Sequence, residues 1–198
     1  MIIKKVSENN NEIQYEYKKQ MGVMKDKKVR PLWLLFPGLG GQWPAMAKAL
    51  MPIKIFADKV EECHQILQEF GIDLKDLLLS EDKTLMSTML SKFCATTALQ
   101  IALIEVIKSL DITPDGIIGH SFGEIACAYA DGCLSTRDAL MITFSRGFHT
   151  ESEHGVGIPK GLMAVVGLSR EETLKWCPKG VFIACNNAKD NVVVSGNH

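Results

Sequence analysis

The sequence predicts an α/β protein with a parallel sheet, and three observations lead to this prediction. A continuous apolar run at residues 32–36 has the length of a strand and opens into a glycine-rich loop. A second apolar stub, Ile117-Ile118, runs into the pentapeptide Gly-His-Ser-Phe-Gly at residues 119–123. Segments with apolar residues at helical spacing lie between these strands and after them. Short strands separated by long helices favour a parallel sheet covered by helices.

The bulk composition limits the possible partners. The chain has 198 residues, of which 46% are hydrophobic and 23% are charged, with a net charge of −1. This is enough for one domain, or for one domain and part of another. The low charge argues against nucleic acid or an anionic membrane as the main partner. No uninterrupted apolar run reaches the ~18 residues that would span a bilayer. The six scattered cysteines form no Cys-x-x-Cys pair, which predicts reduced thiols, a cytoplasmic location and no metal site.

The first 30 residues differ in character from the rest. Residues 1–30 are rich in Lys, Glu, Asn and Gln, and we interpret them as a linker or the edge of a preceding domain that can contain a short strand or helix docking elsewhere. From residue 31 the composition becomes apolar, and residues 31–160 are predicted to form the first part of the core. We expect the strand at 32–36 to be a central parallel strand covered on both faces.

The loop after this strand has three glycines in four positions, within Pro37-Gly38-Leu39-Gly40-Gly41. It lacks both the Gly-Lys-Ser/Thr ending of a phosphate-binding loop and the spacing of a dinucleotide fingerprint. We therefore expect its backbone N–H groups to line the same pocket as the serine of the pentapeptide. Pro44 predicts the first turn of a helix at 45–50.

Five further segments are predicted to be helices from their apolar spacing or flanking signals. They cover residues 53–70, 74–79, 88–110, 124–130 and 136–152. The helix at 88–110 is apolar on more than one side and should be largely buried. Ser135 is expected to cap the helix at 136–152.

The pentapeptide has the strand–turn–helix context of a nucleophile elbow. Gly119 and Gly123 would relieve crowding where the strand and the helix approach each other. Ser121 would then occupy a strained turn with its hydroxyl exposed at the beginning of a helix. The sequence therefore predicts Ser121 as a catalytic nucleophile.

The pattern changes after a loop at 153–160. Strands are predicted at 162–166, 181–185 and 191–195, with a helix at 170–176 and a turn at 186–190. The order β-α-β-β is the first part of a ferredoxin-like unit. We therefore expect residues 161–198 to be an incomplete ferredoxin-like subdomain.

The chain from Pro31 onward resembles the malonyl/acetyl-transferase (acyltransferase) domain of an animal-type fatty acid synthase. The domains of polyketide synthases and the bacterial malonyl-CoA:carrier-protein transacylase are similar. The resemblance depends on four features that occur in the same order as in the family. In addition, the animal synthase subtype is closely resembled by the segment Tyr129-Ala130-Asp131-Gly132-Cys133-Leu134-Ser135. The four main features are Gly38-Leu39-Gly40-Gly41-Gln42-Trp43, the elbow, Ser145-Arg146-Gly147 and Cys185-Asn186-Asn187-Ala188-Lys189-Asp190. It implies an α/β-hydrolase-like core with an inserted ferredoxin-like subdomain.

The resemblance implies a transfer reaction in fatty acid biosynthesis. A serine takes a malonyl or acetyl group from coenzyme A as an ester and passes it to the phosphopantetheine thiol of an acyl carrier protein. No tightly bound cofactor is expected, because coenzyme A enters as part of the substrate. By this resemblance Ser121 is the nucleophile. The backbone N–H groups of Leu39 and Phe122 would form the oxyanion hole.

Five more residues are expected to bind substrate. Arg146 offers a planar fork for the malonyl carboxylate, which an acetyl group lacks. Gln42 is expected to support the loop that contains Leu39. Asn187, Asp190 and Asn191 resemble a segment near the acyl-CoA channel, although a turn rich in Asn and Asp is an equal alternative for them.

The general base is not identified in this sequence. The family uses a histidine about a hundred residues beyond the serine, past the ferredoxin-like insert. None of the five histidines fits that role, since His120 is adjacent to Ser121 and is expected only to brace the turn. We therefore expect this chain to be a fragment of a larger synthase, inactive alone and accompanied by adjacent synthase domains.

Three other interpretations stay open. A polyketide synthase acyltransferase domain would share every feature above. A serine esterase or hydrolase shares Gly-x-Ser-x-Gly, but it predicts a His-Gly-Gly-Gly-type loop and no buried arginine. A non-catalytic module that docks a carrier protein would explain the absent base, but it leaves the elbow and Arg146 without a purpose.

Overall fold

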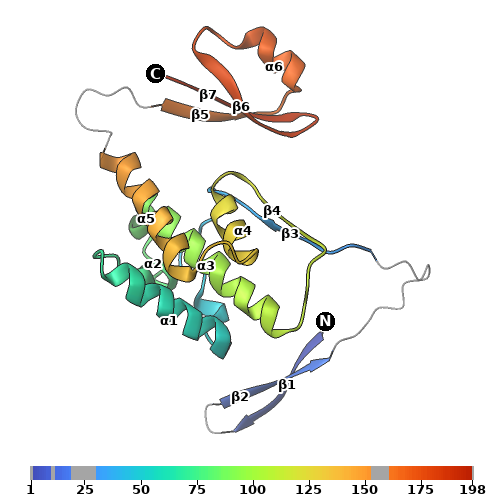
Figure 1. Ribbon diagram of the computed structural model, residues 1–198, viewed down its shortest axis with the longest axis vertical. Helices are drawn as coiled ribbons and strands as arrows, with labels where there is room; N and C mark the ends of the chain where they lie inside the picture. Colours follow the sequence, from blue (N-terminus) through green and yellow to red (C-terminus); the bar gives the residue numbers. More distant parts are fainter. Residues whose placement is uncertain (1, 10–11, 19–29, 153–160, 198) are drawn as a thin grey trace. The chain divides into compact units, whose positions relative to one another are not determined.

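The computed structural model describes residues 2–9, 12–18, 30–152 and 161–197 (Figure 1). The chain divides into two compact units, residues 1–32 and residues 33–198. In the first unit, β1 (Ile2–Asn9) and β2 (Glu12–Lys18) pair as an antiparallel hairpin. The segment interpreted as a linker or domain edge therefore contains two strands.

The larger unit contains the predicted parallel pair. β3 (Trp33–Phe36) and β4 (Gly116–Gly119) pair in parallel, with Trp33 opposite Gly116 (Figure 1). The expectation that β3 is covered on both faces is wrong, because Trp33 and Leu35 are 60% and 63% exposed. Within the described residues β3 pairs with β4 alone, and only the face that contains Phe36 packs into the core.

The predicted helix at 45–50 is also wrong. Ala45 has a φ of 56°, in the left-handed region that an α-helix does not use. Only a 3₁₀ turn, η1 (Lys48–Leu50), forms in this segment. Backbone bonds from the N–H groups of Ala45 and Ala47 to the carbonyls of Ser80 and Leu78 hold the segment against α2 (Leu74–Leu79). Tertiary hydrogen bonds therefore replace the helical ones.

The remaining helices of the core agree with the predictions to within about two residues. Asp82 and Thr88 accept hydrogen bonds from backbone N–H groups at the beginnings of η2 and α3, as N-cap side chains do. Ser135 and Asp138 hold α5 by reciprocal bonds, with Ser135 Oγ accepting from Asp138 N at 3.1 Å, which confirms the predicted cap. The elements are α1 (Lys54–Gln68), η2 (Lys83–Met86), α3 (Met89–Ser109), η3 (Ser121–Gly123), α4 (Glu124–Ala130) and α5 (Thr136–Ser152).

The central helix of the core is α3, which packs against α1, α2, α4 and α5. By length and composition it is the one helix in the described part of the chain that could cross a membrane, although no uninterrupted apolar run suggested this. More than half of its apolar window is buried inside the protein. The core helix of a globular unit has this same character, and the packing of α3 agrees with that role.

The last part of the chain forms a small antiparallel sheet. β5 (Gly161–Val166), β6 (Val181–Ala188) and β7 (Asn191–Asn197) pair in the order β5-β7-β6, and α6 (Arg170–Trp176) packs on β6 and β7. The predicted turn at 186–190 is shorter than expected, because β6 continues to Ala188. The predicted loop at 153–160 lies outside the described residues.

Candidate active site

Ser121 lies in a strained turn between β4 and α4. Its φ is 54°, which is uncommon for a residue with a side chain. The two glycines around it permit this turn. A Cβ atom on Gly119 would lie 2.5 Å from Glu124 Cα, and one on Gly123 would overlap the carbonyl group of Phe36, 2.6 Å from its carbon. The pentapeptide therefore has the backbone geometry of a nucleophile elbow, as predicted.

The glycine-rich loop after β3 meets this elbow. The backbone N–H of His120 donates to the carbonyl of Phe36 at 2.9 Å, which extends the β3–β4 pairing by one residue. A Cβ atom on Gly38 would lie 3.2 Å from Ser121 Cβ and 3.5 Å from the Phe122 nitrogen. A side chain at Gly38 would therefore press against the serine, so this loop lies close to the elbow. Leu39 itself lies in an exposed turn of this loop.

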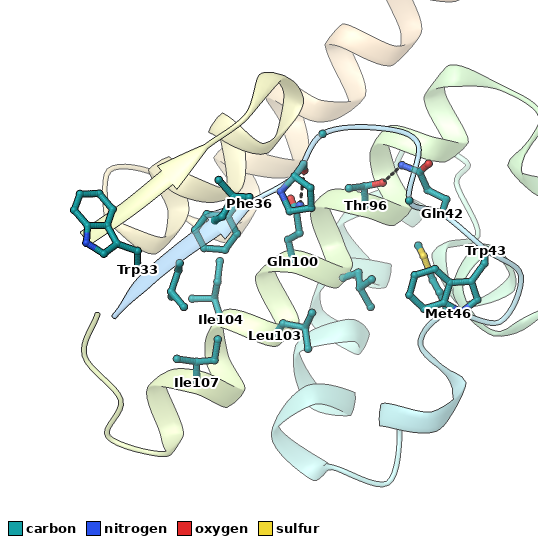
Figure 2. Close-up of a pocket in the computed structure, with 16 residues that line it drawn as sticks. Trp33, Phe36, Gln42, Trp43, Met46, Thr96, Gln100, Leu103, Ile104 and Ile107 are labelled. Carbon is teal, nitrogen blue, oxygen red and sulfur yellow. Dashed lines mark hydrogen bonds between the residues drawn. The ribbon is translucent and has the colours of Figure 1, made fainter. Parts of the chain in front are cut away.

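Side chains of α3 brace the loop from below (Figure 2). Gln42 accepts from the Gly40 N–H at 2.9 Å and donates to Thr96 Oγ1 at 2.7 Å. Gln100 donates to the carbonyl of Pro37 at 2.8 Å. Thr96 and Gln100 are one helical turn apart and are both buried. The geometry agrees with the bracing expected of Gln42.

The contribution of Gln100 was not predicted. Its Nε2 makes the bond to Pro37, whereas its buried Oε1 lacks a hydrogen-bond partner in the described part of the chain. Buried polar groups are usually paired, so an amide in the middle of an apolar helix indicates a specific partner. The signal in the sequence was Gln100 itself, an amide among apolar residues in the middle of α3.

Phe122 anchors the elbow in the core and brings Arg146 to it. The Phe122 side chain is 3% exposed and stacks on Phe93, with ring centroids 4.0 Å apart. Arg146, on α5, places its guanidinium carbon 5.4 Å from the centre of the Phe122 ring. In the part of the chain that the structure describes, Arg146 makes no ion pair with a carboxylate. A cation therefore lies beside the residue that follows the predicted nucleophile.

One of the three candidates on the small sheet reaches the elbow. Asn187 Oδ1 lies 2.9 Å from Nε2 of His120, the residue before Ser121. Asn191 bonds to Asn187, with Nδ2 and Oδ1 3.4 Å apart. Asp190 lies in the turn between β6 and β7, and no bond from it to the elbow is found among the described residues. Asn187 belongs to a strand rather than to the expected turn.

A cavity lies beside the glycine-rich loop, with Pro37, Gly38 and Gly41 in its lining. It has a volume of about 380 Å³ and runs between β3 and α3, from Trp43 past Leu103 to Ile107 (Figure 2). Its lining contains no ionisable side chain, and neither Ser121 nor Arg146 belongs to it. This cavity therefore contains neither the predicted nucleophile nor the predicted carboxylate-binding cation.

Cysteines do not compete with Ser121 as nucleophiles in the core. Burial raises the pKa of the Cys63 and Cys94 thiols to about 12, so both stay protonated near neutral pH. Burial is also the main reason that the pKa of Cys127 is raised, with the Asp131 and Glu124 charges adding to it. Among the residues that the structure describes, no group of three or more His, Cys, Asp or Glu side chains is placed to hold a metal ion.

Comparisons with known proteins agree with this geometry. Residues 33–198 match the profile of the family described as "Acyl transferase domain". The "Highly reducing polyketide synthase AFT9-1" of Alternaria alternata is 36% identical over 171 residues, which are 82% of this chain and 6% of that protein. The "Reducing polyketide synthase BOA6" of Botryotinia fuckeliana is 36% identical over 183 residues, covering 87% of this chain and 7% of that protein. The chain thus spans less than a tenth of these relatives.

Solved structures show the same relationship. The acyltransferase domain from the second module of the salinomycin polyketide synthase superposes with a TM-score of 0.75 at 28% identity, over 86% of this chain and 40% of that one. The domain of SpnD, in complex with 2-(pent-4-yn-1-yl)malonyl, has a TM-score of 0.74 at 25% identity, over 84% of this chain and 40% of that one.

These relatives are polyketide synthases. The animal fatty acid synthase type expected from the sequence is therefore not specifically supported, and the polyketide alternative fits equally well or better. The mixed α/β architecture, the elbow at Ser121 and the match over residues 33–198 lead to one conclusion. The chain belongs to the acyl transferase domain family and is related to the acyltransferase domains of polyketide synthases.

Proposed function

We propose that this chain supplies the nucleophile and the carboxylate-binding side of a polyketide-synthase-type acyltransferase. The enzyme moves a malonyl group from coenzyme A, through an ester on Ser121, to the phosphopantetheine thiol of an acyl carrier protein. The observation that supports this most directly is the meeting of three segments at one point. The strained turn at Ser121, the loop that contains Leu39 and the guanidinium of Arg146 all lie beside Phe122.

The first half-reaction forms an ester. Ser121 Oγ attacks the thioester carbonyl and transfers its proton to a general base, and the carbonyl oxygen becomes an oxyanion. The tetrahedral intermediate then expels the coenzyme A thiolate, which takes up the proton. In the second half-reaction the carrier thiol gives its proton to the base as its sulfur attacks the ester carbonyl, and Ser121 leaves and takes up that proton. The products are a new thioester and free Ser121.

In this proposal the backbone N–H groups of Phe122 and Leu39 stabilise the oxyanion. Phe122 follows Ser121, and a Cβ atom on Gly38, the residue before Leu39, would lie 3.5 Å from the Phe122 nitrogen. A donor in this role typically contributes ~2.7–4 kcal/mol to the transition state. The bonds from Gln42 and Gln100 hold the loop in place before substrate arrives, so little reorganisation is needed during the reaction.

Arg146 would select the acyl group. A malonyl group has a free carboxylate, which can accept two parallel hydrogen bonds from a guanidinium, whereas an acetyl group has none. The guanidinium lies over the Phe122 ring, 5.4 Å from its centre, and no carboxylate of the described chain forms an ion pair with it. The SpnD domain bound to a substituted malonyl group is a relative that accommodates this chemistry.

The remaining predictions from the sequence stay proposals. The order β5-α6-β6-β7 and the pairing β5-β7-β6 support the ferredoxin-like interpretation of residues 161–198. The α/β-hydrolase-like description of the core, the boundaries at residues 30 and 160 and the cytoplasmic location are likewise proposed. Carrier protein and adjacent synthase domains are the proposed partners.

The test compares malonyl-CoA and acetyl-CoA as donors in the full-length protein. Acylation of Ser121 is followed by mass spectrometry of the intact protein or of its active-site peptide. Arg146→Ala should slow acylation from malonyl-CoA by roughly 10- to 100-fold, because a charge-assisted hydrogen bond contributes about 1.5–3 kcal/mol. Acylation from acetyl-CoA should change by less than about threefold.

Arg137 provides a matched control on the same helix. It pairs with Glu69 through two bonds of 2.9 and 2.6 Å, on the opposite part of α5 from the elbow. Arg137→Ala should not change the rate of Ser121 acylation from either donor. Equal losses for both donors in Arg146→Ala would overturn the carboxylate assignment. Rapid hydrolysis of the ester would indicate an esterase, and the absence of any adduct would indicate a docking module.

A further inference from the structure

His120, the residue before Ser121, makes three hydrogen-bond contacts that hold it in place. The His120 N–H donates to the carbonyl of Phe36 at 2.9 Å, and its own carbonyl accepts from the Gly123 N–H at 3.0 Å. These two bonds define the backbone on one side of Ser121. The third contact is made by the imidazole, although residue 120 is exposed. Its Nε2 lies 2.9 Å from Asn187 Oδ1, which comes from a different sheet 67 residues away.

Asn187 is placed for this contact by an irregularity in its strand. Asn186 pairs with Val192 and Ala188 pairs with Asn191, so Asn187 has no partner in β7. A bulge of this kind turns a side chain out of the regular alternation, and bulges are frequent next to active sites. The bond between Asn187 Nδ2 and Asn191 Oδ1 orients the amide so that its oxygen faces His120.

The chemistry of the pair defines the state of the ring. An amide oxygen only accepts hydrogen bonds, so Nε2 of His120 must carry the proton that it shares with Asn187. In the neutral ring Nδ1 is then the unprotonated nitrogen. The contact selects one tautomer and one ring orientation directly next to Ser121.

We propose that Asn187 is a positioning residue for acyl transfer: its amide oxygen holds the imidazole of His120 and ties the β5–β7 sheet to the Ser121 turn. This differs from the substrate contact that the sequence suggested for Asn187, and it rests on the proposed reaction at Ser121. Because Asn187 acts through His120 and not on the acyl group, its loss should lower the rate of acylation more than it weakens donor binding.

The kinetic test uses three variants of the full-length protein with malonyl-CoA. Asn187→Leu keeps the size of the side chain but removes the acceptor, and it should slow single-turnover acylation of Ser121 by about tenfold. The half-saturating donor concentration should change by less than about twofold. Asn187→Asp keeps an acceptor oxygen and should recover the rate to within about threefold of wild type. Asn186→Leu is the matched control on the adjacent strand position and should behave as wild type.

A second measurement does not depend on transfer activity. Diethylpyrocarbonate modifies accessible imidazole nitrogens, and peptide mass spectrometry reports its rate at His120. Asn187→Leu should increase that rate by about fivefold, because the hydrogen bond no longer occupies Nε2. Asn187→Asp and Asn186→Leu should not increase it.

The two measurements separate the possible failures. If wild type forms no acyl adduct, the proposed function fails, while the reagent still tests the His120–Asn187 contact. If wild type is acylated but Asn187→Leu matches Asn186→Leu in both the acylation rate of Ser121 and the modification rate of His120, the positioning role is overturned. If Asn187→Leu mainly weakens donor binding, Asn187 contacts the substrate as the sequence suggested, and the positioning role is also overturned.

Discussion

Replacing Ser121 by glycine should make the protein more stable than replacing it by alanine. At a φ of 54° a residue with a Cβ atom pays roughly 1–2 kcal/mol relative to the right-handed region, and glycine avoids this cost. Glycine also loses more conformational freedom on folding, which offsets roughly 0.5–1 kcal/mol. The expected net advantage of Ser121→Gly over Ser121→Ala is therefore about 0.5–1 kcal/mol.

The assay is thermal or urea unfolding of both variants, neither of which can form the acyl ester. A difference of about 1 kcal/mol corresponds to ~2–4 °C in melting temperature for a chain of this size. Ser145 offers a control of opposite sign, because it is exposed in the interior of the α5 helix. There glycine should be less stable than alanine by about 1 kcal/mol.

The comparison has a clear refuting outcome. If glycine has no advantage at residue 121 while the Ser145 pair behaves as expected, the left-handed turn does not persist in the free protein in solution. The elbow would then form only when substrate or another part of the protein is present. An advantage at residue 121 would show that the nucleophile is held under strain before substrate binds.

Two further predictions concern the packing and the acid stability of the core. Gly123→Ala should destabilise the protein by at least about 3 kcal/mol, because the new Cβ atom would overlap the backbone of Phe36. Gly167→Ala is the control in the same unfolding experiment. A Cβ atom there would meet nothing within 4 Å, so its stability should be nearly unchanged. Burial tends to raise the pKa of Glu105, but the hydrogen bond from Tyr129 and the nearby cations outweigh it and the pKa is lowered. Wild type should therefore have a higher free energy of unfolding than Glu105→Gln at neutral pH. This difference should decline as the pH falls below about 4 and the Glu105 carboxyl is protonated. A difference that does not change with pH would contradict a stabilising role for the ionised carboxylate.

The local structure of the core follows from local patterns in the sequence. The apolar spacing in residues 53–70 and 88–110 predicted α1 and α3, because a helix buries one stripe or, at the centre of a core, most of its surface. The glycines around Ser121 predicted the strained elbow, since a Cβ atom at either position would overlap nearby backbone. The helical spacing and the overlap of Gly119 with Glu124 involve residues close together in the chain, whereas the overlap of Gly123 is with the distant Phe36.

The candidate site could be predicted only in part. The nucleophile and the loop beside it follow from motifs, and Arg146 from a resemblance to known acyltransferases. The relation to polyketide synthases rather than to fatty acid synthases came from comparing the whole chain, because these motifs are shared by both classes.

Contacts between distant residues depended on the tertiary structure. Gln100 meets Pro37 across 63 positions and His120 meets Asn187 across 67, and no local pattern specifies such a partner. The exposed face of β3 could not be predicted for the same reason. An apolar run shows that a strand can be buried, but it does not show which elements cover the strand. The sequence by itself determined α1, α3 and the strained turn at Ser121, because apolar periodicity and small residues around a turn are local properties. Only the tertiary structure decided what holds the loop and the His120 ring in place, because those groups meet through folding rather than through proximity in the chain.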